Sequence, residues 1–434
     1  MKTLGLIPPQ GLHFKLVSEL LSVFSKNWRD DYYRSLLNIP QDYPDQLTIK
    51  VANTLQEVEE AFEIVHDEYW EHGYIDKKSK EMLVTKFHLL PTTSVIVAQW
   101  EGKVIGTMSL INDSPMGLPS EGLQSFNDLR SQNLKKIAEG AFFAVKEEFQ
   151  PAVTWPLIKF FYELSRRVHN VDILILPLPD NKMLTQFLEA VFFIKPLCEE
   201  AFTPHPYLNY GSIKLYLVNF AAIQLKLIKN YWKKPLHQDL FNFLHNHELS
   251  NLEFPNEITH QWSADHLREI FADSDELVKS LNDFEKLCLR QFYQEPIYEN
   301  ILPSFDPEVI DIEDRKRAHQ TLTLNKDSSQ KVAFYNREIR FETNAEGSIA
   351  TSDRVSNIKI MDISLNGLRI KSDQHLKVGN NYKLKTKIDD KSVEINIRTI
   401  WAKKEQSLYG LRVEDHTDVW HKVIHYLIEK EQAS

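Results

Sequence analysis

The chain has 434 residues, of which 42% are hydrophobic and 26% are charged. This length predicts two or three domains that each bury a core, and the composition excludes long disordered, collagen-like or low-complexity segments. The net charge of −10, from 51 Lys and Arg against 61 Asp and Glu, argues against a nucleic-acid polymer as the main partner. A small anionic ligand held by a few arginines remains compatible with it.

The sequence shows no targeting or membrane-spanning segment. Cys198 and Cys288 match no disulfide or metal spacing, so we expect a reducing cytoplasm. No apolar run precedes Pro8, which argues against a signal peptide. The most apolar stretch, Ser212–Ile228, is too short to span a bilayer and contains lysines, so we expect a buried strand that runs into an amphipathic helix. We therefore expect a soluble cytoplasmic protein. Peripheral contact with a membrane surface is compatible with this expectation.

The first part of the chain, residues 1 to about 45, is expected to be a helical extension. An amphipathic helix is predicted from Leu12 to Trp28, followed by an aromatic-rich stretch that ends at Pro44. From 46 to about 225 strands and helices alternate, beginning with the strand LTIKVA and a helix opened by the capping box Thr54–Glu57. The apolar face of this helix comprises Val58, Ala61, Phe62, Val65 and Tyr69.

The alternation continues to about residue 225. The run 94–112 predicts a hairpin, 138–145 a strand, and Pro156 the start of a helix that ends near Arg167. The run 171–179 predicts a buried strand, 182–191 a short helix and 213–220 the last strand. This pattern is typical of an α/β domain rather than an all-helical or all-β one.

The two remaining parts differ in pattern. Residues 226–308 contain no convincing strand and show helix starts near Trp262 and Asp273, so we expect helices there. From 309 to 434, short β-rich runs separated by Gly, Asn and Asp turns, the first of them KVAFY (331–335), predict a small antiparallel β-barrel closed by one helix.

The strongest local motif lies in this barrel. The sequence Asp362-Ile-Ser364-Leu-Asn-Gly367 resembles the D/N-x-S-x-x-G motif of the PilZ domain, the bacterial receptor for cyclic di-GMP. The resemblance extends to strand 396–415 and to the final helix through Trp420. A carboxylate can accept from the N1–H and N2–H groups of guanine, a hydroxyl adds a further polar contact, and glycine permits close backbone approach. The alternative is that these six letters only form a strand and a turn.

PilZ domains pair this motif with R-x-x-x-R, because a guanidinium reads guanine bidentately and pairs with phosphate. The resemblance implies a nucleotide-binding set of Arg315, Arg317, His319, Asp362, Ser364 and Gly367. Counted from Arg315, the second arginine position holds His319, so the strict arginine motif is absent. The loss of one bidentate contact costs ~1–3 kcal/mol, or about ten- to hundred-fold in affinity.

The α/β part resembles the acetyltransferase (GNAT) superfamily and, more closely, the FeeM-type N-acyl amino acid synthases, which are related to the LuxI-type synthases. The stretches that carry this resemblance are Val65–Ile75, Val104–Leu110, Asp113–Pro119, Ile137–Val145 and Tyr207–Gly211. It implies an N-acyltransferase with Glu139 as the catalytic acid or base. The substrate-binding positions that it implies are Tyr69, Tyr74, Gly106 and Asp113.

The residues fit that chemistry. Acyl transfer to an amine needs a base, and desolvation inside an apolar strand would raise the pKa of Glu139 toward a useful range. The alternative is a strand-end Glu that points to solvent. Residues 146–151 contain no Gly and two acids, which disfavours coenzyme A, and the resemblance implies acyl carrier protein as the donor and an amino acid as the acceptor. The helices at 1–45 and 226–308 are expected to line an acyl tunnel or only to cover the sheet.

The remaining features concern a metal site, the tryptophans and a departure from the pattern of the FeeM-type synthases. His245 and His247 do not share a helix face and have no partner ligands, so no metal is expected. Trp155, Trp262 and Trp401 are expected in cores. The segment Pro179–Phe193 lacks the His, Tyr and Gly of the family pattern. Besides a bacterial acyltransferase regulated by cyclic di-GMP, the sequence therefore allows a non-catalytic cyclic di-GMP effector, and a scaffold that has lost both ligands.

Overall fold

The computed structural model describes residues 23–75, 84–131, 136–202, 212–232, 234–255, 262–273, 275–319, 340–350, 355–388, 391–403, 406–415 and 417–433. The chain divides into two compact units, one formed mainly by residues before 336 and the other mainly by residues from 336 onward. Each unit is described by itself.

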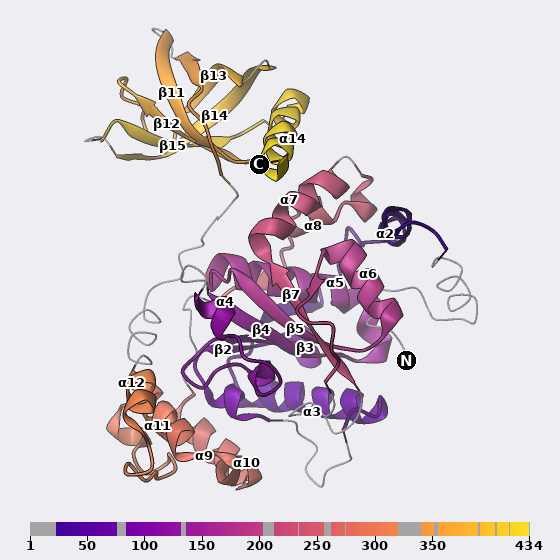
Figure 1. Ribbon diagram of the computed structural model, residues 1–434, viewed down its shortest axis with the longest axis vertical. Helices are drawn as coiled ribbons and strands as arrows, with labels where there is room; N and C mark the ends of the chain where they lie inside the picture. The colour runs from indigo at the N-terminus through magenta and orange to yellow at the C-terminus, as the bar shows by residue number, and fades with distance from the viewer. Residues whose placement is uncertain are drawn as a thin grey trace. The chain divides into compact units, whose positions relative to one another are not determined.

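The first unit is built on an eight-stranded sheet with the order β6-β7-β5-β4-β3-β2-β1-β8 (Figure 1). Its strands are β1 (Leu47–Val51), β2 (Thr93–Trp100), β3 (Lys103–Asn112), β4 (Ile137–Val145), β5 (Ile173–Pro179), β6 (Lys195–Pro196), β7 (Ile213–Asn219) and β8 (Leu252–Glu253). The pairs β4–β5 and β1–β8 are parallel and the others are antiparallel. The sheet is therefore mixed, and its strands alternate with helices, which confirms the predicted α/β fold class.

Among the described residues, eleven α-helices precede the barrel. They are α2 (Lys26–Ser35), α3 (Leu55–Glu71), α4 (Asn127–Ser131), α5 (Gln150–Glu163), α6 (Lys182–Phe192), α7 (Phe220–Tyr231), α8 (Leu240–His245), α9 (Ala264–Asp273), α10 (Asp275–Ser280), α11 (Asp283–Phe292) and α12 (Ile312–His319). Short 3-10 turns lie at Lys86–Leu89, Pro119–Gly122, Glu147–Phe149, Leu236–Gln238 and Pro296–Tyr298.

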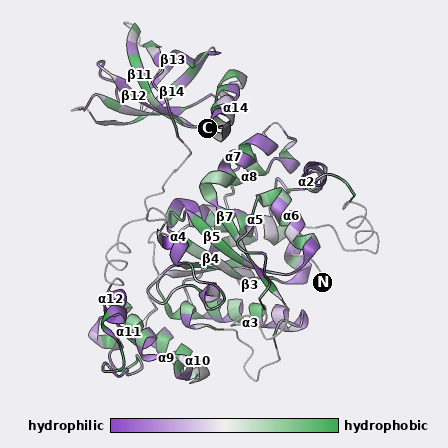
Figure 2. Ribbon diagram, in the orientation of Figure 1, coloured by the Kyte–Doolittle hydropathy of each residue, from purple (hydrophilic) through white to green (hydrophobic). Residues whose placement is uncertain are grey.

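The two faces of the sheet bury different helices. Val95 and Val97 of β2 belong to the same core cluster as α3, whereas Ile96 between them is fully buried on the opposite face, because side chains alternate along a strand. Helix α5 packs against β1 to β4 on that opposite face. Figure 2 shows the middle strands mostly in the hydrophobic colour, as expected for a sheet covered on both sides.

The helices after β8 extend the core on the α3 face. Leu267 of α9 and Leu289 of α11 are fully buried in the same cluster as α3. The indole of Trp262 donates to the carbonyl of His88 at 2.8 Å, and the hydroxyl of Tyr293 donates to the carbonyl of Leu89 at 2.8 Å. Among the described residues of 226–308, these contacts fit helices that cover the sheet, while the acyl tunnel stays a prediction.

Most predicted elements are present with small shifts of their ends. The hairpin β2–β3, the strands β4, β5 and β7, and the helix α3 with its capping box at Thr54 are confirmed. The stretch Ser212–Ile228 forms strand β7 followed by helix α7, as expected. No helix among the described residues is long and apolar enough to cross a bilayer.

Several expectations were wrong in detail. Pro156 lies inside α5, which begins at Gln150 with Pro151 in its first turn, where the missing N–H has no partner to lose. Leu252–Glu253 forms a short strand where only helices were expected, because it pairs in parallel with β1. Helix α2 begins at Lys26, near the predicted end of the Leu12–Trp28 helix, most of which lies outside the described residues together with KVAFY and Tyr207–Gly211.

The second unit is a closed antiparallel barrel followed by a helix, as predicted. Its order is β10-β13-β14-β15-β12-β11, closed by pairing of β10 with β11. Strand β9 pairs with the end of β11, beyond the part that pairs with β10. Its elements are β9 (Phe341–Glu342), β10 (Glu346–Ala350), β11 (Val355–Ile363), β12 (Gly367–Ser372), β13 (Asn381–Ile388), β14 (Lys391–Lys403), β15 (Leu408–Val413) and α14 (Asp418–Ala433). Buried and exposed residues alternate along β13 and β14, as a small barrel requires.

Two tryptophans of the second unit differ in burial. Trp420 of α14 is fully buried and its indole donates to the carbonyl of Leu365 at 2.7 Å. Trp401, expected in the core, is instead 40% exposed. Its indole covers Gly410 on the neighbouring strand, where a Cβ atom would collide with it. Trp155 and Trp262 are buried, as expected.

Candidate functional site

Glu139 is completely buried at the point where the sheet of the first unit forks. It is the last residue of β4 that pairs with β5, opposite Ile175, although both strands continue beyond this point. Its carboxylate accepts the backbone N–H of Ser120 at 2.9 Å on Oε2 and the Ser120 hydroxyl at 2.9 Å on Oε1. The expectation that Glu139 sits in an apolar strand is met, and its alternative, a solvent-facing Glu, is not.

This environment sets the pKa of Glu139. Burial raises the pKa, the two hydrogen bonds from Ser120 lower it, and the charge of Glu121 raises it further, with a net pKa of about 8. A carboxyl group with such a pKa is mostly protonated at pH 7 and becomes half ionised near pH 8. That is the range in which a general base or acid works best.

The turn that carries Ser120 is held by a cluster of charges. The guanidinium of Arg130 donates to both carboxylate oxygens of Asp113 at 2.7 Å and to Oε2 of Glu121 at 2.6 Å. Gly117 has a φ of +78°, and a Cβ atom there would collide with the Glu121 carboxylate. Glycine is therefore required in this turn, and Arg130 fixes both of its ends.

Glu121 stays ionised in this cluster. Burial raises its pKa, but the hydrogen bond and charge of Arg130, the Leu118 N–H and the charge of Arg317 together hold it below the usual value. An ionised Glu121 next to Ser120 contributes to the raised pKa of Glu139. The charge cluster thus supports the tuning of the buried acid.

The predicted substrate-binding residues are not all brought together. Asp113 lies in the charge cluster, joined to Glu139 through Arg130, Glu121 and the turn. Tyr69 and Tyr74 form a separate edge-to-face pair with ring centroids 5.8 Å apart, and burial raises the pKa of both hydroxyls.

Gly106 lies in a closely packed part of the sheet. A Cβ atom there would lie 3.0 Å from Cγ2 of Val145 and 3.3 Å from Cγ1 of Val153, a residue of α5. Gly106 therefore faces α5, whereas Glu139 shares the face of Ile137, which belongs to the core cluster on the α3 side.

A second buried polar group lies beside strained backbone on β4. Phe142 has a φ of 56°, where the register between β3 and β4 shifts, and such strain in a non-glycine residue is often found at functional sites. The His88 ring lies 4.8 Å from the Phe142 ring and 3.4 Å from the Ser109 hydroxyl, and burial lowers its pKa to about 3. His88 is therefore neutral.

The segment that departs from the family pattern still folds as a helix. Asn181 caps α6 by accepting from the N–H groups of Met183 at 3.1 Å and Leu184 at 3.2 Å. Phe193 ends the helix with a φ of 55°. The missing His, Tyr and Gly thus leave the helix intact.

In the barrel, the predicted motif forms a compact site around Asp362. This carboxylate is 3% exposed and forms ion pairs with Arg340 and Arg369. Ser364 donates its N–H at 2.7 Å and its hydroxyl at 3.1 Å to the carbonyl of Gly367. A Cβ atom on Gly367 would lie 2.9 Å from the carbonyl oxygen of Leu411, so only glycine fits.

The arginines at this site differ from those predicted. Arg315 and Arg317 lie on α12 in the first unit, where Arg315 donates to the carbonyl of Ile310 and Arg317 to that of Pro115. The side chain of His319 is not among those that the structure describes. Arg369 stands opposite Asp362 in the β11–β12 register, and Arg340 comes directly before β9.

The sequence contained usable signals for only some of the missed residues. Arg340 lies in Arg-Glu-Ile-Arg, just ahead of the barrel, and Ser120 directly follows the Asp113–Pro119 motif. Arg130 and Arg369 carry no local signal, because their roles depend on contacts across strands.

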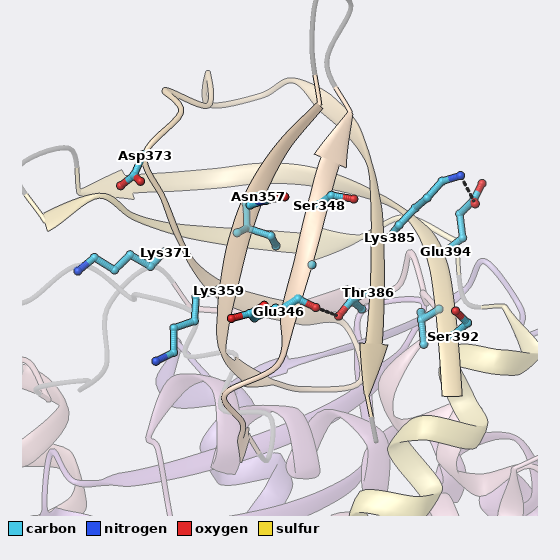
Figure 3. Close-up of a pocket in the computed structure, with 13 residues that line it drawn as sticks. Glu346, Ser348, Asn357, Lys359, Lys371, Asp373, Lys385, Thr386, Ser392 and Glu394 are labelled. Atoms are coloured by element: carbon cyan, nitrogen blue, oxygen red, sulfur yellow. Dashed lines mark hydrogen bonds and ion pairs between the residues drawn. The ribbon is translucent and has the colours of Figure 1, made fainter. Parts of the chain in front are cut away.

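The barrel also has a shallow groove of about 880 Å³ along β10. Figure 3 shows Lys359 and Lys371 on one side of it and Lys385, paired with Glu394, on the other. Asp362, Ser364 and Gly367 are not among its lining residues, so the groove is separate from the Asp362 site.

The described residues contain no group of three or more side chains suited to a metal ion. His245 is hydrogen-bonded to the Tyr162 hydroxyl at 2.9 Å and stacks on Phe241. Burial lowers its pKa, so it is a neutral core residue.

Comparison with known proteins finds a matching family model for each of two segments of the chain. Residues 60–210 match the family model of the N-acyl amino acid synthase FeeM, and residues 335–429 match that of the PilZ domain. The chain thus carries a FeeM-like N-acyl amino acid synthase domain followed by a PilZ domain. No curated protein matches it.

Solved structures similar to the chain include representatives of both parts. FeeM from uncultured soil microbes is 20% identical, covers 41% of this chain and 93% of its own, and has a TM-score of 0.35. The AHL synthase LasI is 13% identical over 42% of this chain and 91% of its own, with a TM-score of 0.31. The PilZ domain of YcgR from Escherichia coli, solved with c-di-GMP, is 11% identical over 22% of this chain and 93% of its own, with a TM-score of 0.19.

Proposed function

We propose that this chain, with its FeeM-like domain and its PilZ domain, is an acyltransferase that moves a long acyl chain from acyl carrier protein to the amine of an amino acid. Cyclic di-GMP, bound by the PilZ domain, regulates the reaction. The observation that carries the proposal is the buried Glu139 inside the FeeM-like segment, with a pKa of about 8 and two donors from Ser120.

That geometry supports the following reaction. The ionised Glu139 takes a proton from the amine of the acceptor, and the amine nitrogen attacks the thioester carbonyl. The C–N bond forms, the C–S bond breaks, and the thiolate leaves with the proton that Glu139 returns. Tyr69, Tyr74 and Asp113 remain proposed contacts for the substrates.

The segment between β4 and α5 supports the proposed donor. This segment is the 3-10 turn Glu147–Phe149, and it places two acidic side chains just before the N-terminus of α5. A coenzyme A pyrophosphate is normally held by helix N-terminal amides, and these acids repel it. Acyl carrier protein, which presents its acyl chain without that pyrophosphate, fits better.

Cyclic di-GMP is assigned to the barrel from the Asp362 site. The buried carboxylate, the two flanking arginines and the close approach at Gly367 supply acceptors for guanine and donors for guanine or phosphate.

The test is mass spectrometry of organic extracts from cells that express the wild type or Glu139→Gln, with cyclic di-GMP raised in both. A new N-acyl amino acid with the wild type alone supports the acyltransferase and identifies the acceptor and chain length. No new lipid in either culture overturns the catalytic half and favours a non-catalytic cyclic di-GMP effector.

A further inference from the structure

Helix α12, the last described element before the barrel, contacts the turn that positions Glu139. Arg317 donates through Nη2 to the carbonyl oxygen of Pro115 at 2.8 Å. Pro115 belongs to the Asp113–Gly122 turn, which ends in the residues that bind Glu139 and Arg130. The contact joins residues 202 positions apart in the sequence.

Helix α12 packs on α11 and buries little surface of its own. The guanidinium of Arg317 lies 5.0 Å from the ring centroid of Phe284 on α11, and it pairs with Asp314 at 3.3 Å. Ala318 is the one fully buried residue among the described side chains of α12, and the Arg317 side chain is 54% exposed. A short polar helix with so little buried surface opens at low free-energy cost.

Hydrogen bonds connect the turn that α12 contacts to Glu139. The Gly117 N–H bonds to the Ser114 carbonyl, the Leu118 N–H to Glu121, and the Ser120 N–H to Glu139. The charge of Arg317 also acts on Glu121. Release of Arg317 would therefore loosen the turn and weaken the hold of Ser120 on Glu139.

We propose that α12 is the regulatory link between the barrel and the active site, and that Arg317 is the positioning residue through which it acts on the Ser120–Glu139 pair. The chain runs from α12 through residues 320–339 to Arg340, which pairs with Asp362. Ligand that binds at Asp362 engages Arg340 and so changes the docking of α12. This inference rests on the proposed function, because it takes cyclic di-GMP as the ligand.

Hydrogen exchange of the full-length protein tests the link without requiring activity. The peptide covering 113–124 is followed in the wild type, in Arg317→Met and in the control Lys316→Met, each with and without saturating cyclic di-GMP. Lys316 pairs only with the exposed Glu313 on the same helix, so its loss leaves the turn unchanged. Arg317→Met is expected to exchange several-fold faster over 113–124 than the wild type or the control.

Cyclic di-GMP is expected to change exchange over 113–124 in the wild type and in Lys316→Met, but not in Arg317→Met. Equal exchange in Arg317→Met and the control overturns the inference, as does an unchanged ligand response in Arg317→Met or no response in the wild type. Nucleotide binding is measured in parallel by calorimetry. Absence of binding removes the proposed regulation and the link with it.

The pH dependence of acyl transfer provides a second readout. Glu139 faces Ser120 and Glu121, and Glu121 is in turn bound by Arg130 and acted on by Arg317. Loss of the Ser120 donors raises the pKa of Glu139, so Arg317→Met should move the acid limb of the rate profile to higher pH. An unmoved profile contradicts the link. If the wild type has no acyl-transfer activity but its hydrogen exchange still changes with cyclic di-GMP, only the catalytic half of the proposed function is wrong.

Discussion

Ser120 donates its backbone N–H and its hydroxyl to the two oxygens of the Glu139 carboxylate, each at 2.9 Å. Both residues are fully buried. The pair places a carboxyl group with a pKa of about 8 at the fork between β4 and β5, where no other donor to it is recorded among the described residues.

The hydroxyl of Ser120 should tune the reaction. Ser120→Ala removes one hydrogen bond to the ionised carboxylate, which is worth about 1.5–3 kcal/mol for a charged partner. The pKa of Glu139 should rise, and the acid limb of the acyl-transfer profile should move up by about one pH unit or more. The control is Ser131→Ala, whose hydroxyl bonds only to the Asp128 carbonyl at the surface. A profile identical to the wild type would contradict this role.

The raised pKa of Glu139 also predicts how stability depends on pH. The folded-state pKa of about 8 lies above the usual value of 4.5, so the fold favours the protonated carboxyl. That contribution is complete below pH 4.5 and is lost as the pH rises to about 8.

Urea unfolding of the wild type and Glu139→Gln across this range measures the effect. The free energy of unfolding of the wild type should fall relative to the variant as the pH rises. A constant difference between the two proteins would show that Glu139 does not titrate in the folded state.

Variants of Arg340 and Arg315 distinguish a nucleotide site at Asp362 from one on α12. Arg340 pairs with the buried Asp362, whereas Arg315 bonds to carbonyls of its own segment in the other unit. Arg340→Ala should weaken cyclic di-GMP binding about ten- to hundred-fold, the value of one lost bidentate contact. Arg315→Ala should bind as the wild type does in titration calorimetry. If Arg315→Ala instead weakened binding more than Arg340→Ala, the nucleotide site would lie at the basic residues of α12.

The closing helix should be essential to the barrel. Trp420 is fully buried and bonded to Leu365, so Trp420→Ala should cost about 3–5 kcal/mol of barrel stability. Val419, the neighbouring residue, is 41% exposed, and Val419→Ala should change stability by less than about 0.5 kcal/mol. Thermal unfolding of both variants compares them, and equal losses would place Trp420 outside the core.

The elements with clear periodicity were predictable. The capping box at Thr54, the hairpin β2–β3 and the alternating barrel strands depend on neighbours in the sequence, so local patterns were enough. Pro156 was misplaced because proline marks both helix starts and tolerated interior positions, and only the earlier Pro151 opened the helix.

The fold and the two candidate sites of this protein were predictable to different degrees. The sequence by itself determined the α/β domain and the barrel, because buried strands and turns are local patterns. The family resemblances pointed to the acids Glu139 and Asp362. Only the tertiary structure decided their partners. Ser120 reaches Glu139 across a folded turn, and strand register sets Arg369 opposite Asp362. Such contacts join distant residues through packing, which no local spacing encodes.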